Sequence, residues 1–409
     1  MSGVFLWVFL QKNIMKQNDY QRWVKRKKRL RRRRRKKRKL KNKNTPLISI
    51  KNISINSDSM GMTKEEGIKQ VYNGGGHVVI LGAGASIASS LRNSEKKGKS
   101  LPSMNNFIEL VGLQDIVDKV PDDLKATNFE ELYSNLHNAD PNSEFIKEIE
   151  KRVFDYFSSM ELPDEPTIYD YLVLSLRSKD AIATFNWDPF LYQAWCRCRK
   201  YTNDLPPIFF LHGNVSIGWD STGKRFGPAG MINPISMQEF VASRLLYPIT
   251  QKNYQQDEFI KTQWKYLQDH LSPEYKAVRA TIFGFGAPAT DVEAVTLLNE
   301  AWGTGDERVM EQFEVVDISP EDELRNKWDK FICGTHYDIA RSYFDSSLAR
   351  NPRRTSEAYF SAYLPMTPSE AFRKPNPIPQ NFKTLDELWQ WHKPLIEAEE
   401  AKRKEQEEQ

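Results

Sequence analysis

Two glycines and a serine in this chain have the type and spacing to hold a phosphate group. They stand in Gly82-Ala-Gly-Ala-Ser86, directly after the apolar residues 77–81. Gly82 and Gly84 lack a Cβ, so the backbone can turn tightly and a phosphate can approach the amide groups. Ser86 adds a hydroxyl donor, or a cap for the helix that follows. An apolar strand, a glycine turn and a helix start are typical of a site for a dinucleotide pyrophosphate, although purely structural turns share this pattern.

Asn186 and His212 are suited to polar catalysis. Asn186 follows the apolar run 181–185, and His212 follows the run 208–211. An asparagine can hydrogen-bond sugar hydroxyls or a water molecule, and a histidine that titrates near pH 6.5 can serve as a general base. A lone histidine before a glycine is more often structural, so the case for His212 depends on the glycine turn and Asn186. Asp188 either fixes the Asn186 loop, stabilises positive charge, or caps a helix that begins at Pro189.

Short apolar runs alternate with segments of helical spacing, and this alternation indicates which elements position these residues. It predicts an α/β fold with a Rossmann-like parallel sheet and helices on both faces. The segment 88–178 is expected to be a helical insertion between the first and second strands. The expected strands are 77–81, 181–185, 208–211, 280–283 and 313–318, with an edge strand at 331–334; the expected later helices are 189–200, 255–271, 291–302 and 337–348.

Each expected strand ends in small or polar residues of the kind that a nucleotide site uses. In a doubly wound sheet, ligands bind beyond the carboxyl ends of the strands. Asp291 follows the fourth strand and is either a ribose or loop contact or, somewhat more simply, a helix cap. The endings are the glycine turn, Asn186 with Asp188, His212 with Gly213, Gly284 with Gly286, and Asp317 with Ser319.

Charge divides the chain unevenly. Residues 1–57 carry 20 Lys and Arg and one Asp, a net +19 against +5 for the whole chain, so the remainder carries −14. The run from Lys25 to Lys43 is almost entirely basic and is expected to be a disordered arm. It is a solvated tail, an upstream extension of the reading frame, or a segment that binds nucleic acid or addresses the chain to a nucleus.

Three cysteines are too few and too scattered for a disulfide framework, which favours a reducing, cytoplasmic compartment, or a nuclear one in a eukaryote. They also cannot form a four-cysteine zinc site, so no metal is expected. No run approaches the roughly 20 apolar residues of a transmembrane helix. The apolar residues 4–10 lack the flanks of a signal peptide, so no membrane partner is expected.

The ordered motifs resemble the sirtuin-like superfamily, whose known members bind and cleave NAD. The resemblance covers roughly residues 70–320 and implies that the glycine turn holds the pyrophosphate. Asn186 and His212 would face the nicotinamide ribose, and segments 284–286 and 317–319 would line the adenosine half. The matching segments are 82–86, 184–188, 211–213, 284–286 with Asp291, and 315–319. The expected cofactor-binding residues are Gly82, Ala83, Gly84, Ser86, Thr184, Gly213, Gly284, Gly286, Asp291, Asp317 and Ser319, and the expected catalytic residues are Asn186, Asp188 and His212.

Departures from the sirtuin pattern favour one branch. Deacylating sirtuins usually carry a four-cysteine zinc module, and this chain has no Cys-x-x-Cys pair. The segment 101–107 keeps only the proline of the family's Pro-Asp-Phe-Arg, and Phe185 stands where classical deacylases have Gln. These departures bring the chain closer to zinc-free sirtuin-like NAD hydrolases, many of which are bacterial anti-phage effectors. The resemblance thus implies an NAD+ glycohydrolase that consumes NAD as its substrate.

The chemistry of that reaction suits the residues. Cleavage builds oxocarbenium character on the ribose and releases neutral nicotinamide, so no protonating acid is needed. An NAD-dependent protein deacylase or ADP-ribosyltransferase, and a non-catalytic nucleotide-binding module, stay open as alternatives. A homo-oligomer, an activating partner, and nucleic acid bound through the basic arm also stay open. The expected domains are a basic arm and linker (1–60), the NAD-binding domain (61–335), and a helical or extended region with a charged tail (336–409).

Overall fold

The computed structural model describes residues 61–91, 100–103, 106–249, 254–272, 277–286, 291–304, 307–308, 311–332, 336–363 and 372–408. The predictions for the basic arm and for Cys333 lie outside the described residues.

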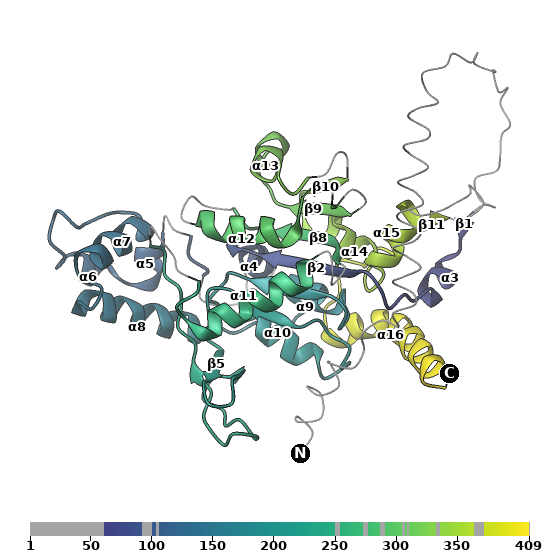
Figure 1. Ribbon diagram of the computed structural model, residues 1–409, viewed down its shortest axis with the longest axis horizontal. Coiled ribbons are helices and arrows are strands. Elements are labelled where there is room, and N and C mark those ends of the chain that lie inside the picture. Colours follow the sequence, from purple (N-terminus) through teal and green to yellow (C-terminus); the bar gives the residue numbers. More distant parts are fainter. Residues whose placement is uncertain are drawn as a thin grey trace, which may run out of the picture.

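A six-stranded parallel sheet forms the centre of the fold (Figure 1), in the order β10-β9-β8-β2-β3-β4. From β2 the chain runs outward through β3 to β4, and it returns at β8 to run the other way through β9 to β10. The expected Rossmann-like parallel sheet is therefore confirmed, with its topological switch point between β2 and β8. The strands are β2 (Gly76–Leu81), β3 (Ala181–Thr184), β4 (Ile208–Phe210), β8 (Ala277–Phe283), β9 (Gln312–Val316) and β10 (Tyr337–Ala340).

Helices cover both faces of this sheet, as expected. Phe209 packs on one face against Tyr266 and His270 of α11 (Glu258–Leu271), which also contacts α12 (Val292–Trp302). Phe209 aligns across the sheet with Ile282, and successive side chains of a strand point to opposite faces, so Phe283 lies on the other face. There it packs against Tyr343. α15 (Thr355–Tyr363) contacts β2 and β8.

Helices also fill the segment between β2 and β3, which confirms the predicted helical insertion. Their buried residues recur at helical spacing, for example Phe129, Leu132 and Leu136 on α7. Figure 1 shows α5 to α8 extending away from the central sheet at one end of the molecule. The helices are α4 (Ala83–Leu91), α5 (Phe107–Val111), α6 (Gln114–Val117), α7 (Phe129–Ala139), α8 (Glu144–Ser158) and α9 (Ile168–Leu174).

The edge strand is not where the sequence analysis places it. Phe331 and Ile332 lie outside any strand, and the edge strand is β10, in a segment expected to be helical. Tyr337 and Ile339 favour strands, and β9 offers them an unpaired edge whose hydrogen bonds outweigh a marginal helix propensity. Only the short α14 (Ser347–Arg350) follows within the expected helix. The sheet thus extends beyond residue 335, where the core domain was expected to end.

A small antiparallel sheet between β4 and α11 was not predicted. Its order is β6-β5-β7, with β5 (Ile217–Asp220), β6 (Arg225–Pro228) and β7 (Val241–Ala242). Figure 1 shows this β5–β7 insertion (residues 217–242) projecting away from the central sheet. Its strands are short and rich in glycine and proline, so they give no clear strand signal.

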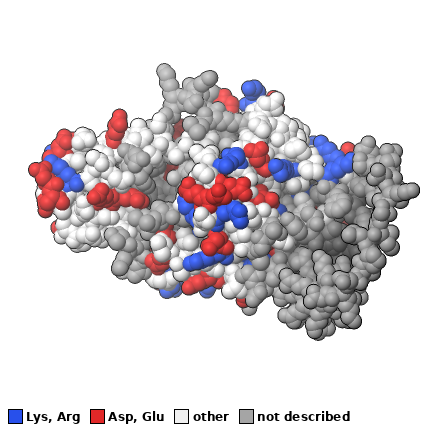
Figure 2. Space-filling view, turned by 90° about the horizontal axis from the view of Figure 1, so that it is seen from above, with Lys and Arg blue, Asp and Glu red and all other residues white. Residues whose placement is uncertain are grey.

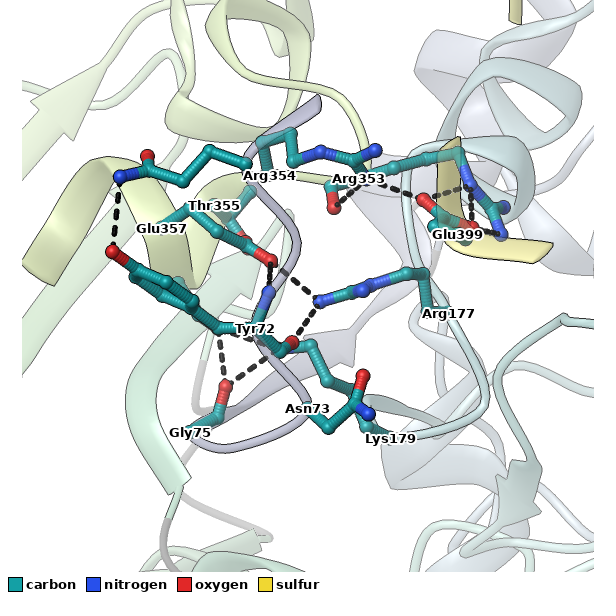
Figure 3. A network of polar contacts seen from close by, with 12 residues as sticks. Tyr72, Asn73, Gly75, Arg177, Lys179, Arg353, Arg354, Thr355, Glu357 and Glu399 are labelled. Atoms are coloured by element: carbon teal, nitrogen blue, oxygen red, sulfur yellow. Dashed lines mark hydrogen bonds and ion pairs between the residues drawn. The ribbon is translucent and has the colours of Figure 1, made fainter. Parts of the chain in front are cut away.

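A buried network of ion pairs holds the C-terminal helix α16 (Leu385–Glu407) against the core (Figure 3). Glu399 of α16 accepts from Arg353 at 2.5 Å and also pairs with Arg354. Arg177, which precedes β3, pairs with Glu357 of α15 at 2.8 Å. All five side chains are buried. We call these residues the arginine network; it lies near the amino ends of the strands, since Arg177 and Lys179 precede β3.

Two buried histidines predict an acid-sensitive fold. Burial lowers the pKa of His392 to about 3 and holds the pKa of His77 well below 6.5. Below pH 6.5 the unfolded chain therefore binds protons that the folded chain does not, and the free energy of unfolding falls as the pH falls. Each histidine contributes up to about 1.4 kcal/mol per pH unit. His392→Asn should flatten this slope between pH 6 and pH 4 in urea unfolding. A wild-type slope in His392→Asn would contradict the account, and His137→Asn, at a partly exposed position, is the control.

Charged side chains of both signs mix on the described surface. Figure 2 looks onto the upper side of Figure 1, where α13 (Glu321–Lys327) lies, and shows acidic and basic groups side by side. The described residues seen on this face form no extended basic surface. No helix among the described residues is long and apolar enough to cross a bilayer.

Candidate active site at the switch point of the sheet

Two glycine turns meet at the switch point between β2 and β8. A Cβ on Gly84 would lie 2.9 Å from Gly284 Cα, and a Cβ on Gly284 would lie 2.4 Å from the Ala85 nitrogen. Gly284 also has φ +61°, and the Gly84 N–H donates to the Gly284 carbonyl at 2.9 Å. Glycine is therefore required here because the two turns pack backbone to backbone. The sequence analysis had ascribed Gly84 to the approach of a phosphate, but its amide is used within the protein.

Ser86 is the centre of a buried polar group, not a helix cap. α4 already begins at Ala83, so the capping alternative is wrong. The Ser86 hydroxyl donates to Asp188 Oδ2 at 2.7 Å and accepts from Asn186 Nδ2 at 2.8 Å. The Tyr169 hydroxyl lies 2.5 Å from the same oxygen, on the third side. We call Ser86, Tyr169, Asn186 and Asp188 the Ser86 group, and all four are buried.

The orientation of the Asn186 amide is fixed by its neighbours. Its Nδ2 donates to the Gly82 carbonyl oxygen at 2.8 Å, and a carbonyl can only accept, so the nitrogen must lie on that side. The Asn186 backbone N–H donates to Thr184 Oγ1 at 3.0 Å, which holds the loop at the end of β3. Among the described residues none donates to Asn186 Oδ1. This oxygen can therefore accept from a hydroxyl of a bound molecule or from water.

Asp188 fixes the Asn186 loop, one of the roles that the sequence analysis left open, and it is not the cap of α10 (Phe190–Cys198), whose cap position is Pro189. Its Oδ2 accepts from Ser86, which fixes the Asn186 loop, and its Oδ1 accepts from the Phe190 N–H at 3.2 Å, at the start of α10. Burial raises the pKa of Asp188 to about 6. A carboxyl group in this environment changes charge close to neutral pH.

His212 lies in a second group of side chains, which we call the His212 group: His212, Phe185, Tyr254 and Asp291. Its Nε2 is 2.9 Å from the Tyr254 hydroxyl and 3.9 Å from Asp291 Oδ1. Its ring meets Phe185 edge to face, with the ring centroids 4.8 Å apart. Asp291 occupies the cap position of α12, but its side chain makes no capping hydrogen bond there. Asp291 instead places a carboxylate beside the histidine.

Asn214 joins the two groups. It lies two residues after His212, and its Nδ2 donates to the backbone oxygens of Asn186 at 3.2 Å and Asp188 at 2.7 Å. Gly213, between His212 and Asn214, has φ +78°, and a Cβ on it would lie 2.2 Å from the Arg244 backbone oxygen. Both the backbone conformation and this close contact require glycine. The loops after β3 and β4 are therefore held together by hydrogen bonds.

The remaining candidates lie along the same edge of the sheet without hydrogen bonds to either group. After β9, Asp317 Oδ1 accepts from the Ser319 N–H at 2.8 Å, and Arg341 donates to the Ile318 oxygen at 2.9 Å. Ile318, between Asp317 and Ser319, is 87% exposed. At Gly286, a Cβ would meet no heavy atom of the described residues within 4 Å.

The sequence analysis missed Tyr169, Asn214 and Tyr254. Tyr169 lies in α9, where every residue is buried, so no polar pattern marks it. Asn214 stands directly after His212-Gly213, and this proximity was the one available signal. No three His, Cys, Asp or Glu side chains within the described ranges are grouped so that they could hold a metal ion.

Comparisons with known proteins give matches among solved structures only. No family model matches the chain, and no curated protein sequence matches it. The solved structures that match include three Sir2 homologue variants, each in complex with ADP-ribose. A serine-to-alanine variant is 12% identical with a TM-score of 0.37, a phenylalanine-to-alanine variant 11% with 0.35, and a histidine-to-asparagine variant 12% with 0.34. The matches cover 74%, 74% and 75% of this chain, and 98%, 98% and 100% of those chains. The fold assignment rests on the strand order and register described above.

Proposed function

We propose that this chain is an NAD+ glycohydrolase that releases nicotinamide and ADP-ribose. The observation that carries the proposal is the buried Ser86 group, set against the two glycine turns at the switch point of a parallel sheet. Open parallel sheets bind nucleotides at this position. NAD is thus the proposed substrate, and no zinc takes part in the proposed reaction.

The pyrophosphate would lie at the amino end of α4. This helix has nine residues and no acidic residue in its first turn, so its dipole favours an anion there. The Gly84 and Ala85 amides donate within the protein, so Ala83 at the helix start is the better candidate donor. The adenosine half would extend past Gly284 and Gly286 toward Asp317 and Ser319, and the nicotinamide ribose would extend toward Asn186.

The reaction breaks the bond between ribose C1′ and the nicotinamide nitrogen. The bonding electron pair goes to the pyridinium ring, which leaves as neutral nicotinamide, and the ribose gains oxocarbenium character. Asn186 Oδ1 accepts from a ribose hydroxyl or from the attacking water. Water adds to C1′, and His212 takes its proton as the general base. Asp188, ionised above about pH 6, holds Ser86 and the loop of Asn186 in place.

Product analysis tests the proposal. The full-length chain is incubated with NAD, and nicotinamide and ADP-ribose are measured by chromatography, with and without an acetylated peptide. Equal amounts of both products, unchanged by the peptide, are expected. O-acetyl-ADP-ribose would instead identify a deacylase, and ADP-ribosylated peptide a transferase. An NAD-consuming enzyme must be restrained in its own cell, so a defence role would require an activating partner.

Asp188→Asn is expected to separate activity from stability. The pKa of Asp188 is about 6 in the folded chain and 3.8 in the unfolded chain. Between about pH 4 and pH 6 the folded chain therefore binds more protons than the unfolded chain, so the free energy of unfolding falls as the pH rises through this range. The amide should therefore be no less stable at pH 7, with a gain of up to about 3 kcal/mol. Nicotinamide release should fall by about 10- to 100-fold. Urea unfolding and initial rates measure the two effects, and full activity of Asp188→Asn would contradict a role for the carboxylate.

A further inference from the structure

The tip of the β5–β7 insertion concentrates exposed apolar side chains. Eight large hydrophobic residues among the described ones are exposed; four of them lie in the loop between β6 and β7, and a fifth, Val241, lies on β7. A monomeric protein rarely exposes a contiguous apolar patch unless something binds it. We call these five the apolar tip: Met231, Ile232, Ile235, Met237 and Val241, which are 53% to 70% exposed.

The backbone of the apolar tip is held in place by hydrogen bonds. The buried Asp220 accepts from the Thr222 and Gly223 amides at 2.9 and 3.0 Å, from Asn233 Nδ2 at 2.7 Å, and from the Ser236 hydroxyl. The Met237 N–H donates to the Asn233 oxygen and the Phe240 N–H to the Met231 oxygen, both at 2.8 Å. The exposed side chains therefore project from an ordered scaffold, which reduces the entropy lost on binding.

The insertion is also fixed to the body of the protein at its base. The Ser243 hydroxyl, just after β7, donates to the Asn214 oxygen at 3.0 Å and accepts from the Asn214 N–H at 3.1 Å. The Ser243 N–H donates to the Ile217 oxygen of β5 at 2.8 Å. Both ends of the insertion are thus bonded together where it leaves the fold.

The charge of the tip suits a second copy of this chain. Residues 226–238 contain no Asp, Glu, Lys, Arg or His, so this part of the tip adds no like-charge repulsion between two copies; Glu239, between Met237 and Val241, is exposed. We propose that the apolar tip is the surface by which two copies of this chain associate around a twofold axis.

The exposed area also fits a dimer. At ordinary side-chain areas the exposed fractions amount to roughly 500 Å² per copy, so two facing tips would bury about 1,000 Å², the lower limit for a specific interface. An interface of this size gives a weak dimer whose population depends on the protein concentration. Two of the five side chains are methionines, which are flexible and can adjust their conformation to pack against the second copy.

Sedimentation velocity over a wide concentration range tests the proposal, with nuclease-treated full-length protein. At high concentration the wild type is expected to have twice the mass of one chain. The double variant Met231→Glu/Met237→Glu is expected to raise the dimer dissociation constant at least tenfold. Val292→Glu makes the same change at a side chain that is 64% exposed outside the tip, and it should dimerise like the wild type. Circular dichroism verifies that each variant is folded. The mass readout is independent of NAD cleavage, so the two proposals fail separately.

Two outcomes overturn the proposal. One is a wild type that stays monomeric over the whole concentration range. The other is a double variant that dimerises with the wild-type dissociation constant. If the monomeric wild type binds phosphatidylcholine vesicles in a flotation assay and the double variant does not, the tip binds a lipid bilayer instead. If the monomer does not bind the vesicles, the tip binds a different protein.

Discussion

Replacing His212 by glutamine is expected to slow nicotinamide release from NAD by about 10²- to 10⁴-fold, the usual contribution of a general base. Glutamine can keep a hydrogen bond to the Tyr254 hydroxyl, which lies 2.9 Å from His212 Nε2, but it cannot take a proton near neutral pH. The loss should therefore appear in kcat, with a small change in KM. His137→Gln, on α7 and outside both groups of the site, is the matched control.

The pH profile distinguishes this role from a structural one. A general base acts only in its deprotonated form, so His212→Gln should lose the part of the wild-type pH dependence that persists in Asp188→Asn, where the carboxyl group with a pKa of about 6 is absent. A variant with a uniformly reduced rate and the wild-type profile would show that His212 only supports the loop. A kcat within about threefold of wild type would contradict the assignment of the base.

Replacing Glu399 by glutamine is expected to lower the free energy of unfolding by about 3 to 5 kcal/mol, because it leaves buried Arg353 and Arg354 without their shared carboxylate. Arg353 keeps only Asp204, at 3.3 Å, as a partner of opposite charge. Urea unfolding measures the effect, and Glu400→Gln, the exposed neighbour on α16, is the control. Equal unfolding midpoints for the two variants would contradict the importance of the arginine network.

The same variant also tests whether the network and the site are separate. The arginine network lies near the amino ends of the strands, and the Ser86 group lies at their carboxyl ends. Folded Glu399→Gln should therefore keep the wild-type kcat for NAD at a temperature well below its unfolding transition. A large loss of kcat in the folded variant would mean that α16 positions the site.

The sheet, and the gathering of the candidate residues along one of its edges, could be predicted because both depend on local signals. Five apolar runs gave five of the six strands, and the rule for ligand sites in parallel sheets placed the candidates along one edge. Helical spacing likewise gave the helical insertion and the helices α10, α11 and α12. The edge strand β10 was missed because its four residues are stabilised by pairing with β9, a contact distant in sequence.

The contacts within the site could not be predicted, because they join residues far apart in the chain. Tyr169 reaches Ser86 across 83 positions, from a helix with no polar pattern. Gly84 was assigned to a phosphate because nothing in the sequence shows that Gly284 packs against it. The buried state of Glu399 was hidden in the same way, since it stands in a charged segment that is typical of a solvated tail.

The most direct test of the central claim compares wild type and Asn186→Ala with NAD. Calorimetry measures NAD binding, which needs no activating partner, and chromatography measures nicotinamide release. We expect the wild type to bind NAD and release nicotinamide and ADP-ribose in equal amounts, and Asn186→Ala to release them at least about 100-fold more slowly, since Asn186 Oδ1 would no longer orient the ribose or the water. A wild type that does not bind NAD, or equal rates for the two proteins, would contradict the account.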